Sequence, residues 1–130
     1  MSRTKSIGPT DKELQILSIL WKNGPSTVRQ INKIMNWSEN TGYTTTLKLM
    51  QIMFEKGLLK RDETSKTHIY LPLRSESVVQ EEVIGNLLDR AFAGSVGKLV
   101  LRVLNSKKIS PEELAKIKKI INQKEKEMQT

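Results

Sequence analysis

Residues 37–57 read WSENTGYTTTLKLMQIMFEKG, the most informative stretch of the chain. Its pattern predicts a helix from about Gly42 to Lys56, with hydroxyl side chains in the first turn and apolar residues later. Threonine is a mediocre helix former, because its branched Cβ restricts the side chain against the preceding turn. Three threonines in succession suit a helix whose first turn meets phosphates and base edges in the major groove of DNA. The alternative is an ordinary cap followed by a half-buried helix.

Helical spacing separates two faces of this segment. The inner face is expected to carry Thr46, Leu49, Met50, Met53 and Phe54. The outer face carries Thr44, Thr45, Lys48 and Gln51. Gly57 is expected to end the helix as a C-terminal cap.

Two shorter helices are expected before it, each opening with a capping box: Thr10 with Glu13, and Thr27 with Gln30. The first is expected to end at residues 23–25 and the second at residues 36–37. Residues 1–9 are expected to form a loose arm.

Residues 67–73 alternate, with Thr67, Ile69 and Leu71 on one side and His68 and Tyr70 on the other, whereas residues 58–63 alternate imperfectly. With the short polar tip between them, the two segments predict a two-stranded hairpin. Three helices followed by a hairpin describe a winged helix-turn-helix, in a mainly α chain. We therefore expect residues 1–74 to form a winged-helix DNA-binding domain. The hairpin is the wing, and Lys66 near its tip is a candidate contact for the DNA backbone.

Three amphipathic helices are expected in residues 75–130: at 75–92, at 95–104, and from Ser110 to a fraying tail at 123–130. These 56 residues are too few to bury their apolar surface alone, so we expect them to form a dimerisation domain with a second copy. The alternative is that they pack back onto the winged helix of the same chain. The expected dimer contacts are Val79, Val83, Leu87, Leu99, Val103, Leu114, Ile117 and Ile121.

The formal net charge of +8 is uneven along the chain. Residues 1–74 carry 12 basic and 6 acidic side chains, whereas residues 75–130 carry 10 and 8. A basic domain favours a polyanionic partner, most often nucleic acid. The chain has no cysteine and a single histidine, His68, so we expect no metal site and no cofactor. It has no long apolar run and no signal sequence, so we expect a cytoplasmic protein.

Several short segments together resemble the penicillinase and methicillin-resistance repressors of the BlaI/MecI type, with the copper-responsive CopY repressors as relatives. In the N-terminal part these are LW at 20–21 before NGP at 23–25, TVR at 27–29, YTT at 43–45, EKGL at 55–58 and YLPL at 70–73. In the C-terminal part they are GS at 94–95, LV at 99–100 and ISPEEL at 109–114. The resemblance covers about residues 8–122.

The resemblance implies a homodimeric winged-helix repressor that binds an inverted-repeat DNA operator. It also implies induction by a membrane sensor protease pathway that leads to cleavage in the dimerisation region. The third helix of the family enters the major groove. On that basis the leading base contacts are Thr44, Thr45 and Lys48, with Tyr43 and Gln51 behind them. The second helix would contribute phosphate contacts from Arg29 and Lys33.

The chain departs from the family pattern in three respects. Leu47 and Ile52 stand where the family often has basic residues, so a different base preference is expected. Where the penicillinase repressors carry an Asn–Phe cleavage bond, this chain has Arg102-Val103, the candidate proteolytic site, so the same protease specificity is not implied. Copper sensing through C-terminal cysteines is excluded, because there are none.

Two other classes of function are compatible with parts of the sequence. A winged-helix protein-interaction module without sequence-specific DNA binding would explain apolar Leu47 and Ile52 on a partly exposed helix. An enzyme is the weakest option. The acidic pairs 81–82 and 112–113 fit a solvated helix face or a helix first turn, and no glycine-rich phosphate loop is present.

Overall fold

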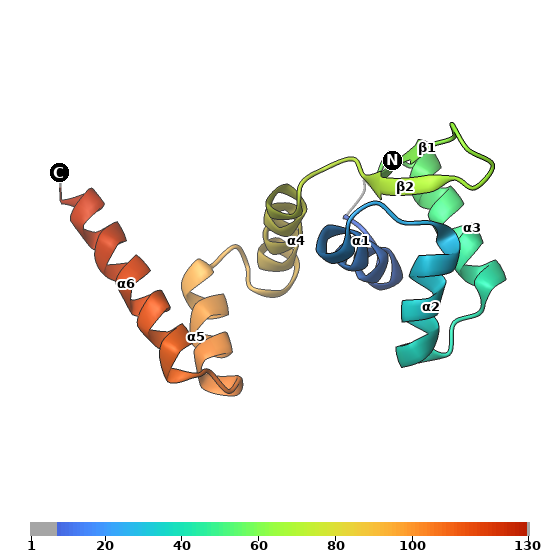
Figure 1. Ribbon diagram of the computed structural model, residues 1–130. Coiled ribbons are helices and arrows are strands. Elements are labelled where there is room, and N and C mark those ends of the chain that lie inside the picture. The colour runs from blue at the N-terminus through green and yellow to red at the C-terminus, as the bar shows by residue number, and fades with distance from the viewer. Residues whose placement is uncertain (1–7, 130) are drawn as a thin grey trace. The chain divides into compact units, whose positions relative to one another are not determined.

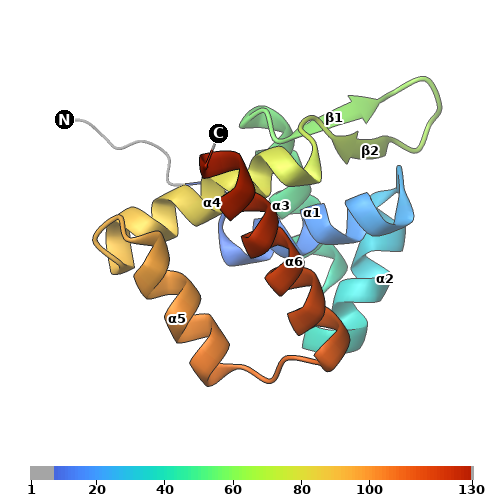
Figure 2. The same cartoon turned by 90° about the vertical axis from the view of Figure 1, so that its left-hand side faces the viewer.

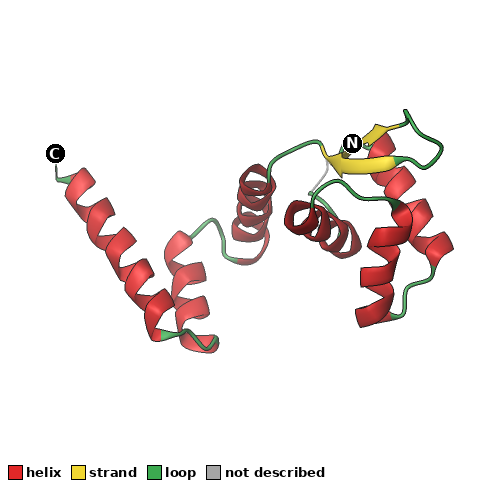
Figure 3. Cartoon of the chain, in the orientation of Figure 1, coloured by secondary structure: helices red, strands yellow, loops and turns green. Residues whose placement is uncertain are grey.

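The computed structural model describes residues 8–129, so most of the arm expected at 1–9 lies outside the described residues. The elements follow one another as α1 (Asp11–Asn23), α2 (Val28–Glu39), α3 (Tyr43–Glu55), β1 (Leu59–Asp62), β2 (Ile69–Pro72), α4 (Glu76–Ala91), α5 (Val96–Ser106) and α6 (Pro111–Met128). Figure 1 follows this order by colour, and Figure 3 separates helices from the one hairpin of the described chain. None of the helices described is long and apolar enough to cross a membrane.

The predicted mainly α winged helix-turn-helix is confirmed. Helices α1, α2 and α3 pack on one another, and the hairpin follows α3 directly (Figure 2). Strands β1 and β2 are antiparallel, with Leu59 opposite Pro72 and Asp62 opposite Ile69. The loop before α2 extends the wing, because Ser26 exchanges two backbone hydrogen bonds with Tyr70, at 2.8 and 3.0 Å.

One apolar core joins these elements. Its buried members are Ile16, Leu17 and Leu20 of α1, Val28, Ile31 and Met35 of α2, Met50 and Met53 of α3, Leu59 and Tyr70 of the hairpin, and Val79 of α4. Helical residues contribute at spacings of three and four, as the sequence pattern requires. The hairpin contributes alternate residues, so Tyr70 points inward between half-buried neighbours.

Local signals set most helix ends. Both predicted capping boxes are formed: Thr10 with Glu13, and Thr27 with Gln30. Gly57, at φ +82°, follows α3 in the left-handed region that glycine tolerates. There its N–H donates to the carbonyl of Phe54 at 3.2 Å, while that of Leu58 donates to Met53 at 2.9 Å, a Schellman ending.

Two helix ends differ from expectation. Helix α2 continues past residues 36–37 to Glu39, because Asn40 takes up the left-handed conformation at φ 55° and its N–H donates to the Asn36 carbonyl. Asparagine tolerates that conformation better than most residues. Helix α6 continues to Met128, so most of the tail expected to fray is helical.

The chain divides into two compact units, Met1–Leu87 and Leu88–Thr130. The division falls inside α4, whereas the sequence placed a boundary after residue 74. The reason is local: Val79 is 1% exposed in the winged-helix core, and Val83 packs against that core. The beginning of α4 is therefore part of the winged-helix unit.

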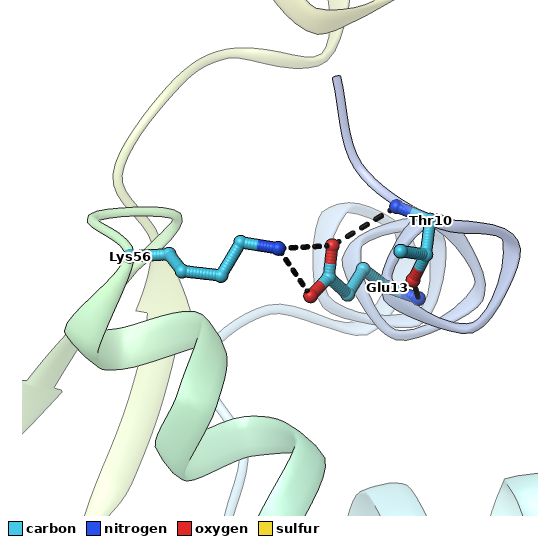
Figure 4. A network of polar contacts seen from close by, with 3 residues as sticks. All are labelled: Thr10, Glu13 and Lys56. Carbon is cyan, nitrogen blue, oxygen red and sulfur yellow. Dashed lines mark hydrogen bonds and ion pairs between the residues drawn. The ribbon is translucent and has the colours of Figure 1, made fainter. Parts of the chain in front are cut away.

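One ion pair links the start of α1 to the end of α3 (Figure 4). The Glu13 side chain, 4% exposed, accepts from Lys56 Nζ at 2.8 and 3.0 Å and from the Thr10 N–H at 2.9 Å. Burial raises the pKa of Glu13, but the hydrogen bonds from Lys56 and Thr10 outweigh it, and the net pKa is lowered. Glu13 is thus held ionised inside the fold.

We predict that Lys56→Met lowers the free energy of unfolding by about 1–2 kcal/mol near pH 7, because Glu13 loses its partner. The loss is limited because the Lys56 side chain is about half exposed, so water can approach the carboxylate from that side. The folded pKa of Glu13 is below its unfolded value. The pair therefore stabilises the fold above the ordinary pKa of glutamate, and the contribution disappears as the pH falls through the folded value. Urea unfolding near pH 7 and near pH 3 measures both effects. The control is Lys60→Met, at an exposed position; an equal loss in both variants would contradict the role of the pair.

Candidate nucleic-acid interface

The outer face of α3 is the leading candidate for reading DNA. The side chains of Thr44, Thr45, Lys48 and Gln51 are exposed, as the spacing predicted. On the opposite side Thr46, Met50 and Met53 are completely buried. Core packing therefore fixes which side of α3 faces outward. Leu49 and Phe54, expected in the core, are half-buried and pack against its edge.

Only the third of the three successive threonines is structural. The Asn32 side-chain amide donates to Thr46 Oγ1 at 2.9 Å and to the Thr41 carbonyl at 2.7 Å. Asn32 lies on α2, so these bonds join the helix to the turn and to the first turn of α3. Buried polar groups need hydrogen-bond partners, and Asn32 supplies one to each of the buried residues Thr41 and Thr46. Thr44 and Thr45 take no part in this contact and remain exposed.

Tyr43, at the start of α3, is 43% exposed and lies beneath a cation. The guanidinium carbon of Arg29 is 5.4 Å from the centre of the Tyr43 ring, within the range of a cation–π interaction. Arg29 is exposed on the first turn of α2. The ring limits the positions open to this guanidinium, and because Arg29 remains exposed, a phosphate could reach it.

A groove of about 310 Å³ runs between the start of α2, α3 and the wing. Basic side chains reach it from three elements: Arg29 from α2, Arg61 from β1 and Lys66 from the hairpin tip. Polar lining comes from Thr27, Tyr43, Gln51, Thr67 and His68. Arg29, Tyr43, Gln51 and Lys66, four of the candidate DNA-binding residues, are therefore brought together at one site. Lys33 is exposed on α2 but does not line the groove.

Arg61 was not among the DNA-binding residues predicted from the sequence. Its guanidinium carbon is 4.0 Å from the centre of the Phe54 ring, and its Nε donates to Glu63 at 2.6 Å. Hydrogen bonding to Tyr70 and Glu63 raises the pKa of Arg61. The alternation of residues 58–63 placed Arg61 on one side of a strand, but only the pairing of Arg61 with Tyr70 brings it to the groove.

The expected dimer contacts fall into two environments. Val79 lies in the winged-helix core and Val83 packs against it. The core of the first unit therefore already covers these two side chains, wholly or in part. Leu87, Val103, Leu114 and Ile121 are between 43% and 49% exposed, and Leu99 and Ile117 are half-buried. No residue of α5 or α6, both fully described, is buried.

The candidate cleavage bond between Arg102 and Val103 lies within α5, and both side chains are exposed. Among residues 8–129, no group of three or more His, Cys, Asp or Glu side chains is placed to hold a metal ion.

The profile of the penicillinase repressor family matches residues 9–123. The chain belongs to the penicillinase repressor family. The penicillinase repressor of Bacillus licheniformis is 26% identical over 118 residues, covering 88% of this chain and 89% of that protein. The methicillin resistance regulatory protein MecI of Staphylococcus aureus strain N315 is 21% identical over 112 residues, covering 86% and 91%.

A MarR family protein from Bacillus stearothermophilus has a similar fold, with a TM-score of 0.52 and 22% identity. The likeness covers 94% of this chain and 76% of that one. Members of the penicillinase repressor family are DNA-binding transcriptional repressors and not enzymes. The family resemblance and the absence of enzymatic function expected from the sequence are thus confirmed.

We predict that Thr46→Val lowers the free energy of unfolding by about 1–2 kcal/mol, because the Asn32 amide loses one acceptor in a buried place. Thr45→Val is the matched control: the same substitution one residue earlier, at an exposed position, should change stability by less than about 0.5 kcal/mol. Urea unfolding of both variants is the measurement. Equal stabilities would show that the Asn32–Thr46 bond contributes nothing.

Proposed function

We propose that this chain is a homodimeric repressor that binds an inverted-repeat operator through the outer face of α3. The observation that supports it most directly is the exposed row of Thr44, Thr45 and Lys48 beside a groove into which Arg29 and Lys66 reach. In such an arrangement α3 would read base edges in the major groove while the basic side chains bind phosphates on either side. Its place of action would be the cytoplasm, where bacterial DNA lies.

The alternative, a protein-interaction module, depended on apolar residues at the surface of α3. Leu47 is half-buried and packs against the core, and Ile52 is 37% exposed. Of the two apolar residues on which this alternative rests, only Ile52 is therefore exposed. We favour DNA as the partner for this face.

The experiment that tests DNA binding is a gel-shift titration against DNA upstream of the protein's own gene. It is run at two salt concentrations with scrambled DNA as competitor. Tight, competitor-resistant and salt-sensitive binding supports the repressor. Weak binding that scrambled DNA matches, even at low salt, would favour the protein-interaction module.

We predict that Lys48→Ala weakens operator binding and lowers the slope of log affinity against log salt by about 0.9 for each phosphate that is no longer neutralised. The fold should be unaffected, because the Lys48 side chain is exposed. Lys22→Ala is the control, since it removes the same charge from the exposed end of α1. Equal operator affinity for the wild type and Lys48→Ala would remove this residue from the reading face.

We also propose that the apolar surface of residues 75–130 forms the dimer, with α4 contributing to both the winged helix and the interface. Large apolar side chains are exposed on α4, α5 and α6: Ile84, Leu87, Val96, Val100, Leu101, Val103, Leu114, Ile120 and Ile121. So much apolar surface on short helices is typical of an interface. A closed two-fold dimer would also match the symmetry of an inverted repeat.

We predict that Val103→Glu weakens dimerisation and operator affinity together, because it places a charge in the proposed interface. The control is Ile34→Glu on α2, since Ile34 and Val103 are both 43% exposed. Sedimentation over a range of concentrations measures the dimer, and gel shift measures the DNA affinity. A monomeric variant with wild-type operator affinity would separate the two properties and contradict the proposal.

Relief of repression by a sensor-protease pathway is part of the same proposal. The bond between Arg102 and Val103 is inside α5, so a protease would need the helix to unwind locally before cutting it. Few buried contacts favour such local opening, and none of the residues of α5, which is described throughout, is buried within the chain. Cutting there would separate α6 from the rest of the proposed dimer region.

A further inference from the structure

The positive charge of this chain is concentrated outside the winged helix. Residues 1–87 carry 12 basic and 9 acidic side chains, a net +3, whereas residues 88–130 carry 10 and 5, a net +5. Residues 1–74 alone carry more net positive charge than residues 75–130, but the first unit also includes the acidic residues Glu76, Glu81 and Glu82 of α4. The smaller unit, not the one with the reading helix, is therefore the more basic.

Within this unit, several lysines of α6 lie on one side of the helix. Lys116, Lys119 and Lys126 recur with helical spacing and share one side of α6 with Gln123. Glu112 and Glu127 lie on the same side, where the three lysines outnumber them. Leu114, Ile117 and Ile121 occupy the other side. We call the first set the α6 lysine face. Its three lysines are exposed, and none forms an ion pair with another described residue.

This charge works against self-association. Two copies of a +5 unit that meet through their apolar helix faces would repel each other, and net charge of one sign opposes a compact assembly. The repulsion is smallest when the lysines face away from the interface and meet a polyanion. Lys116, Lys119 and Lys126 lie opposite the apolar face of α6, which fits that arrangement, whereas Lys118 and Lys124 border the apolar face.

We propose that the α6 lysine face is a second phosphate-binding surface, which contacts the DNA backbone outside the bases read by α3. This inference rests on the proposed function, because it requires the chain to bind DNA. Lysine is a flexible point charge, so the surface would bind phosphates without reading sequence. Each phosphate that it neutralises releases condensed counterions and adds salt-dependent affinity.

The test compares two double variants of the full-length chain. Lys119→Gln with Lys126→Gln removes two charges from the α6 lysine face. Lys118→Gln with Lys124→Gln removes two exposed charges from the same helix at positions that border the apolar face. Lys118 follows Leu114 by four residues, and Lys124 follows Ile121 by three. The two variants thus have equal net charge, and sedimentation shows whether each is still a dimer.

The readout is the slope of log affinity against log salt, on the operator and on scrambled DNA. Each neutralised phosphate contributes about 0.9 to the magnitude of this slope, and a dimer of the first variant lacks four lysines. We therefore expect the first variant to lower the magnitude of the slope by roughly 3–4. The decrease should appear on both DNAs, because phosphates are present in both. The control variant should keep the wild-type slope.

Equal slopes for the wild type and both variants would overturn the proposal, as would equal decreases in the two variants, which indicate a general charge effect. These results are distinct from failure of the proposed function. In that case the wild-type chain would not prefer the operator over scrambled DNA. Operator-specific binding by the wild type with three equal slopes would remove the α6 surface and leave the repressor standing.

Discussion

The winged-helix unit depends on the burial of one side of α3 against α1 and α2. Thr46, Met50 and Met53 are completely buried there, and the apolar contacts provide most of the stabilisation. Two polar contacts fix the position of α3 within this packing: Asn32 holds its beginning, and the Glu13–Lys56 pair holds its end. Apolar packing alone tolerates small shifts along a helix, whereas buried hydrogen bonds break when their partners move. The outward residues of α3 therefore have a defined direction.

The basic groove follows from the same placement. Because α3 and the wing share a core, the start of α2 and the hairpin lie on either side of the groove, and Arg29, Arg61 and Lys66 converge from separate elements. Two of these cations rest on aromatic rings, Arg29 on Tyr43 and Arg61 on Phe54. Such contacts restrict the guanidinium groups, which would reduce the entropy cost of binding phosphates at this groove.

The second unit, residues 88–130, differs from the first in how little of its apolar surface is buried. Its helices are well capped, with Ser95 and Ser110 accepting from backbone N–H groups, yet no side chain along the fully described α5 and α6 is buried. A 43-residue unit with exposed apolar faces and a net charge of +5 is incomplete in two respects. In the proposed dimer a second copy would cover its apolar surface, and DNA would balance its charge. A DNA-bound dimer would satisfy both.

The helices and the hairpin were predictable from the sequence because their signals are local: capping boxes at Thr10 and Thr27, the glycine after α3, and helical spacing of apolar residues. It also separated the two faces of α3 and carried the family resemblance, which the family profile confirms. Contacts between residues far apart in the chain became known only from the fold. It assigned Val79 to the winged-helix core, brought Arg61 to the groove, paired Glu13 with Lys56, and moved the charge boundary into α4. Spacing along one segment fixes the side of a helix on which a residue lies, but packing between segments decides what that side meets.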